Sequence, residues 1–365
     1  MDDYIVSGNK RLRRGFTTGS CAVVAAKAAT ILLLSGESVK KIHFNTKYGS
    51  SLLLDVFTDD YACDKYASCF AIKDAGDDPD VTNGIKIVAT VSKIDTGIQI
   101  DGGKGVGRVT KTGLKIPVGD AAINPTPLNM IETEVTSVIK TYQYTGGLKI
   151  IISVPNGEEI AKKTMNERLG IINGISILGT TGIVEPMSEK AIIDTIKTEI
   201  DVHVSEGRNI LIMTPGNYGR DFAKDILNIN INDAVKCSNF IGEALDYAIY
   251  SGVKEMLLIG HAGKLIKLAG GIMNTHSSIA DCRMEIIASH CAMAGVSAEN
   301  IIKIMSCITV DATIEIIRKM EIYDQILCSL ERKINFHIKQ QTKGCMVVKY
   351  IIFTQKYGVL INSQV

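Results

Sequence analysis

The sequence predicts an α+β N-terminal domain followed by an α/β Rossmann-like domain with a mostly parallel sheet. In the first part of the chain, one Ala-rich helix is followed by strand-like segments separated by Asp and Gly turns. From Leu148 onward the order strand, loop, helix repeats, which is typical of a parallel sheet with helices on both faces. The length of 365 residues is sufficient for two domains with substantial cores.

These patterns divide the chain near residue 145. Residues 1–145 are expected to form the α+β domain and to bind a substrate. Residues 146–330 are expected to form the Rossmann-like domain and to bind a nucleotide-like cofactor. Residues 331–365 are read as a helix end and a strand, and the sequence leaves their packing open.

Composition limits the classes of function. The net charge is +1, from 40 Lys and Arg against 39 Asp and Glu, which argues against bulk electrostatic binding to nucleic acid or to an anionic membrane. The chain has no Trp and only 5% aromatic residues, so a base-stacking platform for single strands is not expected. We therefore predict no nucleic-acid partner and no membrane partner.

The same properties favour a cytoplasmic location. The N-terminal residues MDDYIVSGNKRLRRG contain no apolar run typical of a secretory signal. The longest apolar run, Ala22 to Leu34, includes Lys27 and is too short to span a bilayer. Nine scattered cysteines without a CxxC pair are expected to be reduced and mostly buried thiols, and no metal site is predicted.

The first helix is expected after Thr17-Thr18-Gly19-Ser20, with Thr18 or Ser20 as its N-cap, and should end at Ser35-Gly36. The free N–H groups of its first turn, beside hydroxyls, could bind an anion. Plain helix capping is the equally weighted alternative.

Strands are expected within residues 41–100, forming a largely antiparallel or mixed sheet. Within this region, KDAGDDPDVTNG (73–84) has four acidic residues and several turn residues, so it must be a loop. It could be an acidic structural turn, a wall of the active site or, less favoured, a metal site, and it lacks the spacing of an EF-hand loop.

The glycine-rich segment at 101–119 is not a dinucleotide fingerprint. The residues after Gly103-x-Gly105-x-Gly107 do not form the amphipathic helix that the fingerprint requires. A glycine-rich loop with three cations is better suited to carboxylates or phosphates; these cations are Lys104, Arg108 and Lys111.

In the second domain, several strands are followed by loops rich in small and polar residues. The strand GISIL leads into Gly179-Thr180-Thr181-Gly182, where bare backbone lets a polar small molecule approach closely. Ligands of parallel sheets bind beyond the carboxyl ends of the strands, where such loops converge. The loops expected there follow residues 148–154, 174–178, 209–214, 234–235 and 255–260.

Two segments of this domain resemble sites of known chemistry in part. GHAGK (260–264) lacks the earlier glycine and the Ser or Thr of a phosphate loop, so nucleoside triphosphate chemistry is not expected. THSSIADCRMEI (275–286) is expected to place His276 at a helix start. His261 and His276 are candidate acid/base groups or carboxylate contacts, and ordinary hydrogen-bonded loop histidines are the alternative.

Eight segments together carry a family resemblance. RRGFTTGSCA (13–22), KDAGDDPDVTNG, GGKGVGRVTKTGL (102–114), AINPTPLNMI (122–131), the segment 152–188, KCSNFIGEALD (236–246), GHAGKLIKLAGGIMNTHSS (260–278) and ADCRMEI (280–286) stand in order and with natural spacing. The chain resembles the cobalt-precorrin-5B C1-methyltransferases, the CbiD family of anaerobic cobalamin biosynthesis. The resemblance runs from about Arg13 to Glu285.

The resemblance implies methyl transfer from S-adenosyl-L-methionine to ring carbon C1 of cobalt-precorrin-5B, giving cobalt-precorrin-6A. The substrate would be a polycarboxylate macrocycle carrying its own cobalt, and a homo-oligomer is compatible with the family. The expected cofactor contacts are Gly179, Thr180, Thr181, Gly182, Glu185 and Asn217. The expected substrate contacts are Thr17, Thr18, Ser20, Asp77, Asp78, Lys104, Arg108 and Lys111, with Asp77 or Asp78 alternatively on the cofactor. His261 and His276 are the candidates for a catalytic base.

One departure and two alternatives accompany this resemblance. Leu128 stands where the family is expected to carry Arg after AINPxP, so a substrate carboxylate bound there would need another cation, such as Lys111 or Lys115. A nicotinamide-dependent reductase of a corrin precursor would suit the second domain, but no helix-opening GxGxxG occurs there. A non-catalytic tetrapyrrole carrier would not need a second ligand domain.

Overall fold

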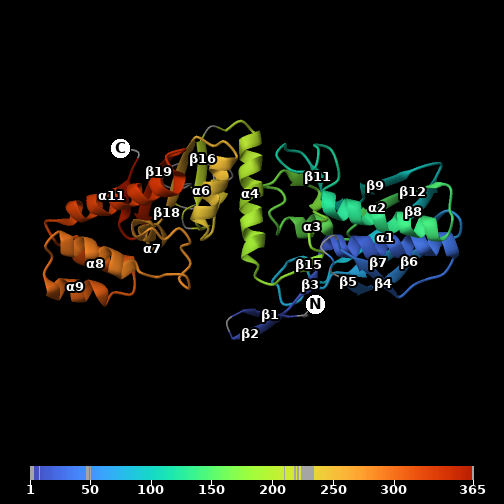
Figure 1. Cartoon of the computed structure of the whole chain (residues 1–365), viewed down its shortest axis with the longest axis horizontal. Coiled ribbons are helices and arrows are strands. Elements are labelled where there is room, and N and C mark those ends of the chain that lie inside the picture. Colours follow the sequence, from blue (N-terminus) through green and yellow to red (C-terminus); the bar gives the residue numbers. More distant parts are fainter. Residues whose placement is uncertain are drawn as a thin grey trace. The chain divides into compact units, whose positions relative to one another are not determined.

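The structure is a computed structural model that describes residues 4–7, 9–46, 49, 51–208, 210–217, 219, 222 and 234–363. The chain forms two compact units, Met1–Ser188 and Glu189–Val365, each with helices and sheets (Figure 1). The protein is therefore mixed α/β, as the sequence predicts. The first unit ends at Ser188 and the second begins at Glu189 in the sequence, whereas the domain boundary was expected near residue 145.

The first unit is organised around a mixed five-stranded sheet in the order β6-β7-β8-β12-β9. Neighbouring strands are antiparallel, except that β12 runs parallel to β9. The strands are β6 (Phe57–Ala62), β7 (Tyr66–Ile72), β8 (Lys86–Ile94), β9 (Ile98–Gly102) and β12 (Gly147–Ser153). This confirms the expected antiparallel or mixed sheet.

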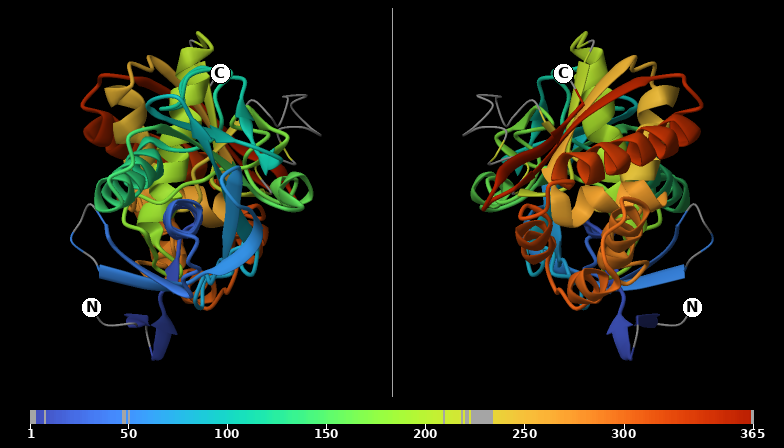
Figure 2. Two further views of the ribbon diagram at one scale, coloured as in Figure 1. Left: turned by 90° about the vertical axis from the view of Figure 1, so that its right-hand side faces the viewer. Right: turned by 90° about the vertical axis from the view of Figure 1, so that its left-hand side faces the viewer.

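Helix α1 (Thr18–Ser35) forms the core of this unit. Residues Cys21 to Ala26 are 0% exposed, because their small side chains let neighbouring elements pack on every side of the helix. It contacts β7, β8 and α2 (Pro125–Thr141), and Figure 2 (left) looks almost along its axis. Among the described residues, α1 is the one helix long and apolar enough to cross a membrane, and 78% of it is buried inside the structure. Buried core helices meet the same criteria.

Short strands and hairpins complete the first unit. β4 pairs with β5 and β1 with β2 as hairpins, while β3–β15, β10–β14 and β11–β13 join distant segments. These elements are β1 (Tyr4–Ser7), β2 (Lys10–Arg13), β3 (Gly15–Phe16), β4 (Lys41–Asn45), β5 (Ser51–Asp55), β10 (Gly105–Val106), β11 (Arg108–Val109), α3 (Gly157–Ala161), β13 (Ile171–Ile172), β14 (Gly174–Ile175) and β15 (Ile183–Val184).

The second unit contains a five-stranded sheet in the order β17-β16-β18-β19-β20. Its first four strands are parallel and β20 is antiparallel to β19, so the expected mostly parallel sheet is present. The strands are β16 (Ile210–Thr214), β17 (Ala234–Lys236), β18 (Glu255–His261), β19 (Val347–Thr354) and β20 (Gly358–Asn362).

Helices pack around this sheet to form the larger core of the second unit. Ile326, Leu330 and Ile334 of α11 are buried at helical spacing, and α11 contacts α6 and η2 (Figure 2, right). The helices are α4 (Glu189–Ser205), α6 (Ile241–Tyr250), α7 (Ala262–Leu265), η2 (Ile266–Gly270), α8 (Arg283–Met293), α9 (Ala298–Met305), α10 (Val310–Ile317) and α11 (Tyr323–Thr342). The helix expected over 221–227 lies outside the described residues, apart from Phe222.

Two expectations about strand placement differ from the structure. The strand expected to begin the second domain, β12, pairs with β8 and β9 of the first unit. The last residues, whose packing the sequence left open, supply β19 and β20 of the second sheet. An apolar strand fits either sheet equally well by its own pattern, so its partners are decided by tertiary packing.

The cysteines are less buried than expected. All nine are free thiols; four are buried, one is intermediate, and Cys63, Cys282, Cys328 and Cys345 are exposed. Burial raises the pKa of Cys21 and of Cys237 to about 12, so both thiols are held in the neutral form.

Candidate active site

The start of α1 is built around Thr17, Thr18 and Ser20. Thr17 is the N-cap, and its side chain accepts from the Ser20 N–H at 3.1 Å. The expectation that Thr18 or Ser20 is the N-cap is therefore wrong. Thr18 points elsewhere because its hydroxyl bonds to another segment of the chain.

That other segment is the loop that contains Gly179 and Gly182. Thr18 Oγ1 accepts from the Leu178 N–H at 2.9 Å, and the Gly19 N–H donates to the Leu178 carbonyl, also at 2.9 Å. Ser20 Oγ donates to the Gly182 carbonyl at 2.6 Å. The structure thus brings the predicted substrate hydroxyls and the predicted cofactor loop together, and these groups bond to each other. The first-turn N–H groups of Gly19 and Ser20 are engaged by protein acceptors, as plain capping requires.

The glycines of this loop are needed for close packing. Gly179 has φ +138°, and a Cβ built there would lie 2.2 Å from Thr17 Oγ1. A Cβ on Gly182 would lie 2.9 Å from Ser20 Oγ. Between the glycines, the side chains of Thr180 and Thr181 are exposed, and Thr181 Oγ1 donates to the Ile183 carbonyl at 3.0 Å. The exposed threonines are therefore the part of the loop that can meet a ligand.

Arginines and acidic residues border the loop. The Arg13 guanidinium donates to both oxygens of Asp74, at 2.6 and 2.7 Å, and holds the pKa of that carboxyl below its ordinary value. Arg14 pairs with Glu185 at 3.0 Å. The Asp74 carboxylate therefore binds the acidic loop to Arg13, the last residue of β2.

Two further carboxylates fix the same region. Asp77 accepts from the Arg13 N–H at 2.6 Å, and Asp78 accepts from the Met187 N–H at 2.9 Å. Among the residues that the structure describes, no group of three His, Cys, Asp or Glu side chains could hold a metal ion. These contacts are those of a structural turn. They are compatible with both of the favoured expectations for residues 73–84, an acidic structural turn and a wall of the active site.

The basic glycine-rich segment lies in the same unit. Arg108 pairs with Asp101 at 2.8 Å and donates to the Gly102 carbonyl at 2.7 Å, while Lys104 is exposed. The glycines serve backbone packing: a Cβ on Gly105 would lie 2.0 Å from the Val154 carbonyl. Lys104 is thus presented to solvent by a tightly packed loop.

Two neighbouring features complete the predicted substrate contacts. The aliphatic stem of Lys111 packs on Gly170, where a Cβ would lie 2.3 Å from Lys111 Cγ. Leu128, where the family was expected to carry Arg, is partly buried against the core around α1. A leucine is therefore suited to this position by packing.

In the second unit, the loops converge at the carboxyl edge of the parallel sheet. β17 lies on one side of β16 and β18 on the other, so the strand order reverses between β16 and β18. Residues 214–217 leave β16 there, and residues 261–264 leave β18. Of the five loops expected at such an edge, those after residues 148–154 and 174–178 belong to the first unit instead.

Two lysines connect the loops of this edge. Lys264 Nζ donates to the Pro215 carbonyl at 2.9 Å, which joins the loops after β18 and β16. Lys236 Nζ donates to Asn217 Oδ1 at 2.9 Å. Burial lowers the pKa of Lys264, and the neighbouring Lys236 and Lys267 lower it further. This edge is therefore positively charged.

His261 ends β18 and caps the short helix α7. Its Nδ1 accepts from the Gly263 N–H at 3.0 Å, and its Nε2 lies 3.8 Å from Asp311 Oδ2. Burial lowers the pKa of His261, which favours the neutral ring. A neutral ring that accepts at Nδ1 carries its proton on Nε2, facing Asp311.

His276 lies in a turn and not at a helix start as expected, because α8 begins only at Arg283. Its Nδ1 accepts from the Ser278 N–H at 3.2 Å. In both candidate histidines, Nδ1 therefore accepts from the backbone N–H two residues later in the chain. The turn is held by the buried Lys267, whose Nζ donates to the carbonyls of Thr275 and Ala280 at 3.1 and 2.7 Å. The turn adjoins the loop after β17 through the Thr275 N–H, which donates to the Asn239 carbonyl at 2.9 Å.

The predicted site residues thus form two groups. One group lies in the first unit around Thr18 and Leu178, and the other lies at the carboxyl edge of the second sheet. Asn217 belongs to the second group, apart in sequence and unit from the other predicted cofactor contacts. Thr214, Lys264, Lys267 and Asp311, which also lie in this region of the second unit, are not among the residues predicted from the sequence. A lone cation directly after a parallel strand, as in GHAGK, was the available signal for Lys264.

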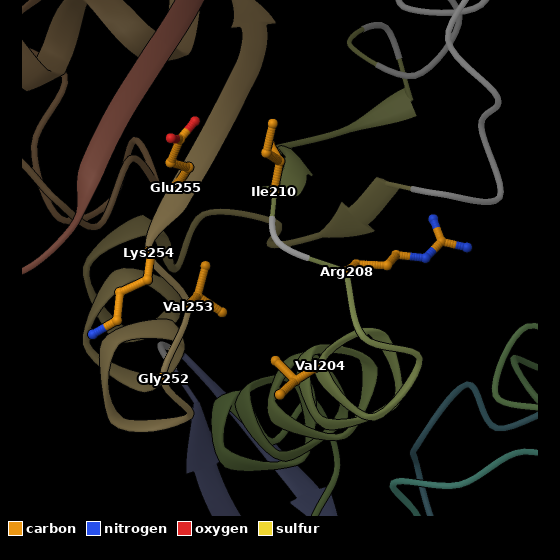
Figure 3. A pocket seen from close by; sticks show the side chains of 7 residues that line it. All are labelled: Val204, Arg208, Ile210, Gly252, Val253, Lys254 and Glu255. Atoms are coloured by element: carbon orange, nitrogen blue, oxygen red, sulfur yellow. The ribbon is translucent and has the colours of Figure 1, made fainter.

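A pocket of about 270 Å³ lies at the opposite, amino edge of the second sheet (Figure 3). It is formed where α4 ends and where β16 and β18 begin. Its lining residues are Val204, Arg208, Ile210, Gly252, Val253, Lys254 and Glu255. Because ligands of parallel sheets bind at the carboxyl edge, we do not assign this pocket to the active site.

Comparison with known proteins extends the motif resemblance to nearly the whole chain. The sequence model of the CbiD family matches residues 5–186, and that of the CbiD C-terminal domain matches residues 274–364. A Cobalt-precorrin-5B C(1)-methyltransferase from Ruminiclostridium cellulolyticum is 50% identical over 354 residues, which are 97% of this chain and 92% of that protein. One from Alkaliphilus metalliredigens is 45% identical over 363 residues, 99% of this chain and 95% of that protein.

Among solved structures, the crystal structure of a cobalamin biosynthesis protein (cbiD) from Archaeoglobus fulgidus is 30% identical to this chain. It aligns over 77% of this chain and 88% of its own, with a TM-score of 0.41. The sequence relatives are similar at both ends of the chain and through its middle, so the similarity is not confined to one shared domain. The chain belongs to the CbiD family.

Proposed function

We propose that this chain is a cobalt-precorrin-5B C(1)-methyltransferase of cobalamin biosynthesis. The observation that carries the proposal is the 50% identity, over 97% of the chain, to a protein of that name. Because the alignment covers 97% of this chain, the loop around Gly179 and the carboxyl edge of the second sheet both lie inside the aligned region. The substrate would be the macrocycle with its own cobalt, and the product cobalt-precorrin-6A.

We infer that the methyl donor is S-adenosyl-L-methionine and that the second unit is a Rossmann-like domain that contributes to binding it. In support, the strand order of its parallel sheet reverses between β16 and β18, where nucleotide-type ligands bind in such sheets. The residues at this point also fit a ligand: Thr214 Oγ1 is buried without a hydrogen-bond partner among the described residues, and Lys264 is a partly buried cation. Asn217 and Thr214 would contact the ligand there. Thr180, Thr181 and Glu185 of the first unit, whose side chains are exposed, remain predicted cofactor contacts.

The donor supplies a methyl group on a positively charged sulfur. Carbon C1 would attack this methyl in line with the methyl–sulfur bond. The C1–methyl bond would form as the methyl–sulfur bond breaks, and the electron pair of the broken bond would stay on sulfur, giving S-adenosylhomocysteine. The protein's contribution to such a displacement is to align the two carbons and to exclude water. No metal supplied by the protein is required.

The first unit would bind the macrocycle through its carboxylate arms. Lys104 is exposed, Arg108 is half-exposed, and Lys111 lies on the same basic segment, so each can meet a carboxylate. Thr17, Thr18 and Ser20 would act indirectly, by fixing the loop that carries Thr180 and Thr181, and Asp77 and Asp78 would form a wall. These roles differ from direct contact for the hydroxyls, because their hydrogen bonds are made within the protein.

His261 and His276 remain the candidate proton acceptors. In each ring Nδ1 is engaged by a backbone N–H, so accepting a proton there requires that hydrogen bond to open. His276 is exposed, whereas His261 packs edge-on against Phe353, so His276 can turn with less disruption. We propose His276 as the first of the two to substitute in a test of the pH–rate profile.

The free thiols and the buried α1 support a cytoplasmic location.

The decisive experiment is a calorimetric titration of the full chain with S-adenosylhomocysteine, with NADPH as the control ligand. Saturable binding of S-adenosylhomocysteine alone supports the methyltransferase, and binding of NADPH alone overturns it in favour of a reductase. If neither binds, the titration is repeated with cobyrinic acid present. Binding of S-adenosylhomocysteine then supports a site completed by the macrocycle, and silence favours a carrier. Size-exclusion chromatography of the same sample gives the oligomeric state.

A further inference from the structure

Lys264 is a partly buried cation without a carboxylate partner among the described residues. Its ammonium group has three donor hydrogens, and the Pro215 carbonyl takes one of them at 2.9 Å. Burial lowers the pKa of Lys264, the Cys237 thiol acts in the opposite direction, and the nearby Lys236 and Lys267, which have the same sign as Lys264, lower the pKa further. Buried charges in proteins are normally paired, so within the described part of the chain Lys264 lacks the negative charge that would balance it.

A second polar group is the side chain of Thr214, the residue before Pro215, whose carbonyl accepts from Lys264 Nζ. Thr214 is 0% exposed, and its Oγ1 makes no hydrogen bond with the residues that the structure describes. Its backbone is ordered, because the Thr214 carbonyl accepts from the Cys237 N–H at 3.0 Å. A buried hydroxyl without a partner costs about 1–3 kcal/mol, so such a group is uncommon unless a ligand uses it.

Gly216 lies beside the ammonium. Among the described residues, a Cβ built on Gly216 would have one neighbour within 4 Å, Lys264 Nζ at 3.9 Å. Because glycine has no side chain, the loop backbone itself can take part in a site at the cation. Thr214 and Gly216 lie at and after the end of β16, and Lys264 lies three residues after the end of β18, and the strand order of the second sheet reverses between these two strands.

We propose that Lys264, together with the loop Thr214–Asn217, forms a subsite for a ligand carboxylate at this point of the sheet. Lys264 would donate to the carboxylate and at the same time tie the loop after β16 to the loop after β18. The inference rests on the proposed function, because both ligands of that reaction carry carboxylates: the amino-acid part of the methyl donor and the arms of the macrocycle. A carboxylate is favoured over a phosphate because neither of these ligands carries a phosphate.

The test compares Lys264→Met with the wild type in calorimetric titrations. The probes are S-adenosylhomocysteine, its decarboxylated analogue S-adenosyl-3-thiopropylamine, and cobyrinic acid. If the donor's carboxylate occupies the subsite, the variant binds S-adenosylhomocysteine about tenfold or more weakly and binds the decarboxylated analogue as the wild type does. If a macrocycle carboxylate occupies it, only the affinity for cobyrinic acid falls by that factor.

Two controls separate a lost contact from a lost fold. Lys254→Met removes an exposed lysine at the amino edge of the same sheet and should leave all three affinities unchanged. Lys264→Arg keeps the charge and should recover part of the affinity. The thermal midpoint of each variant verifies that it is folded.

The outcomes distinguish this inference from the proposed function. Wild-type affinities in Lys264→Met for all three probes would overturn the subsite while leaving the methyltransferase intact. A wild-type chain that binds neither S-adenosylhomocysteine nor cobyrinic acid would overturn the proposed function, and the subsite with it. A loss of affinity that Lys254→Met shares equally would also count against a specific role of Lys264.

Discussion

Thr18 and Leu178 are joined through the Thr18 hydroxyl, which accepts from the Leu178 N–H at 2.9 Å and lies 3.2 Å from the Leu178 carbonyl. The two residues are 160 positions apart in the sequence. The contact fixes the loop that precedes Gly179 onto the first turn of the buried helix α1. A loop held in this way can present Thr180 and Thr181 in a constant position, which a binding site requires.

Thr18→Val should therefore destabilise the first unit. The substitution keeps the shape of the side chain but leaves the Leu178 N–H without its acceptor, which costs about 1–3 kcal/mol. The free energy of unfolding from urea titration checks this. Thr18→Ser keeps the hydroxyl and should lose much less, and equal losses in both variants would contradict a role for the hydrogen bond.

Gly179→Ala should destabilise the protein through both backbone and contact. At φ +138° an alanine is strained, and its Cβ would lie 2.2 Å from Thr17 Oγ1, so we expect a loss of more than about 2 kcal/mol. Gly84→Ala is the matched control, because Gly84 also has positive φ but nothing lies within 4 Å of its Cβ position. Its loss should be about 1 kcal/mol. Thermal unfolding that ranks the two variants in the opposite order would be inconsistent with this packing.

Glu185→Gln and Thr181→Val should weaken binding of S-adenosylhomocysteine without unfolding the protein. Both side chains are exposed, and the Arg14–Glu185 ion pair is a surface pair worth about 0–1 kcal/mol. We expect affinities about three- to tenfold lower by calorimetry, with the thermal midpoint nearly unchanged. Glu159→Gln, which breaks another exposed pair in the same unit, is the control. Unchanged affinity in both variants would remove this loop from the cofactor site.

The protein should lose stability as the pH falls below 6.5, the ordinary value for histidine. Burial lowers the pKa of His261 and of His290 in the folded state, so below pH 6.5 the unfolded chain binds more protons than the folded chain. The stabilisation is complete above pH 6.5 and is lost as the pH falls toward the folded values. Urea unfolding between pH 8 and pH 5 measures the slope.

His261→Asn isolates the share of His261 in this slope. Asn can accept the Gly263 N–H in the same capping role, but it does not titrate. The slope of the unfolding free energy between about pH 6.5 and pH 5 should therefore be smaller in this variant, with stability at pH 8 nearly retained. A slope equal to that of the wild type would show that His261 is not protonated on unfolding in this range.

Local sequence patterns were sufficient for much of the secondary structure. The Ala-rich run after Thr17 and the glycine at position 36 define α1, because small residues pack tightly and glycine adopts the left-handed C-cap, here with φ 76°. The alternation of strands, loops and helices after residue 209 identified the parallel sheet and put Asn217 and His261 at its carboxyl edge. The motifs in their order were sufficient to identify the family.

Partnerships between distant segments could not be read from these patterns. β12 has an apolar pattern that fits either sheet, and its pairing with β8 moved the unit boundary to Ser188. The hydroxyls of Thr17, Thr18 and Ser20 have the same chemistry whether they bind a ligand or a loop. Only the folded chain shows that they bind the loop up to Gly182.

Residue order alone was sufficient for the family, for the mixed sheet of the first unit and the mostly parallel sheet of the second, and for the types of side chain at the carboxyl ends of the parallel strands. These depend on local periodicity and on residue identity, which the chain carries at each position. The tertiary structure decided which segments pair, which hydroxyls are already used and which cation, Lys264, lies without a carboxylate partner among the described residues. Those properties depend on contacts between residues far apart in the chain, which form only when the whole unit packs.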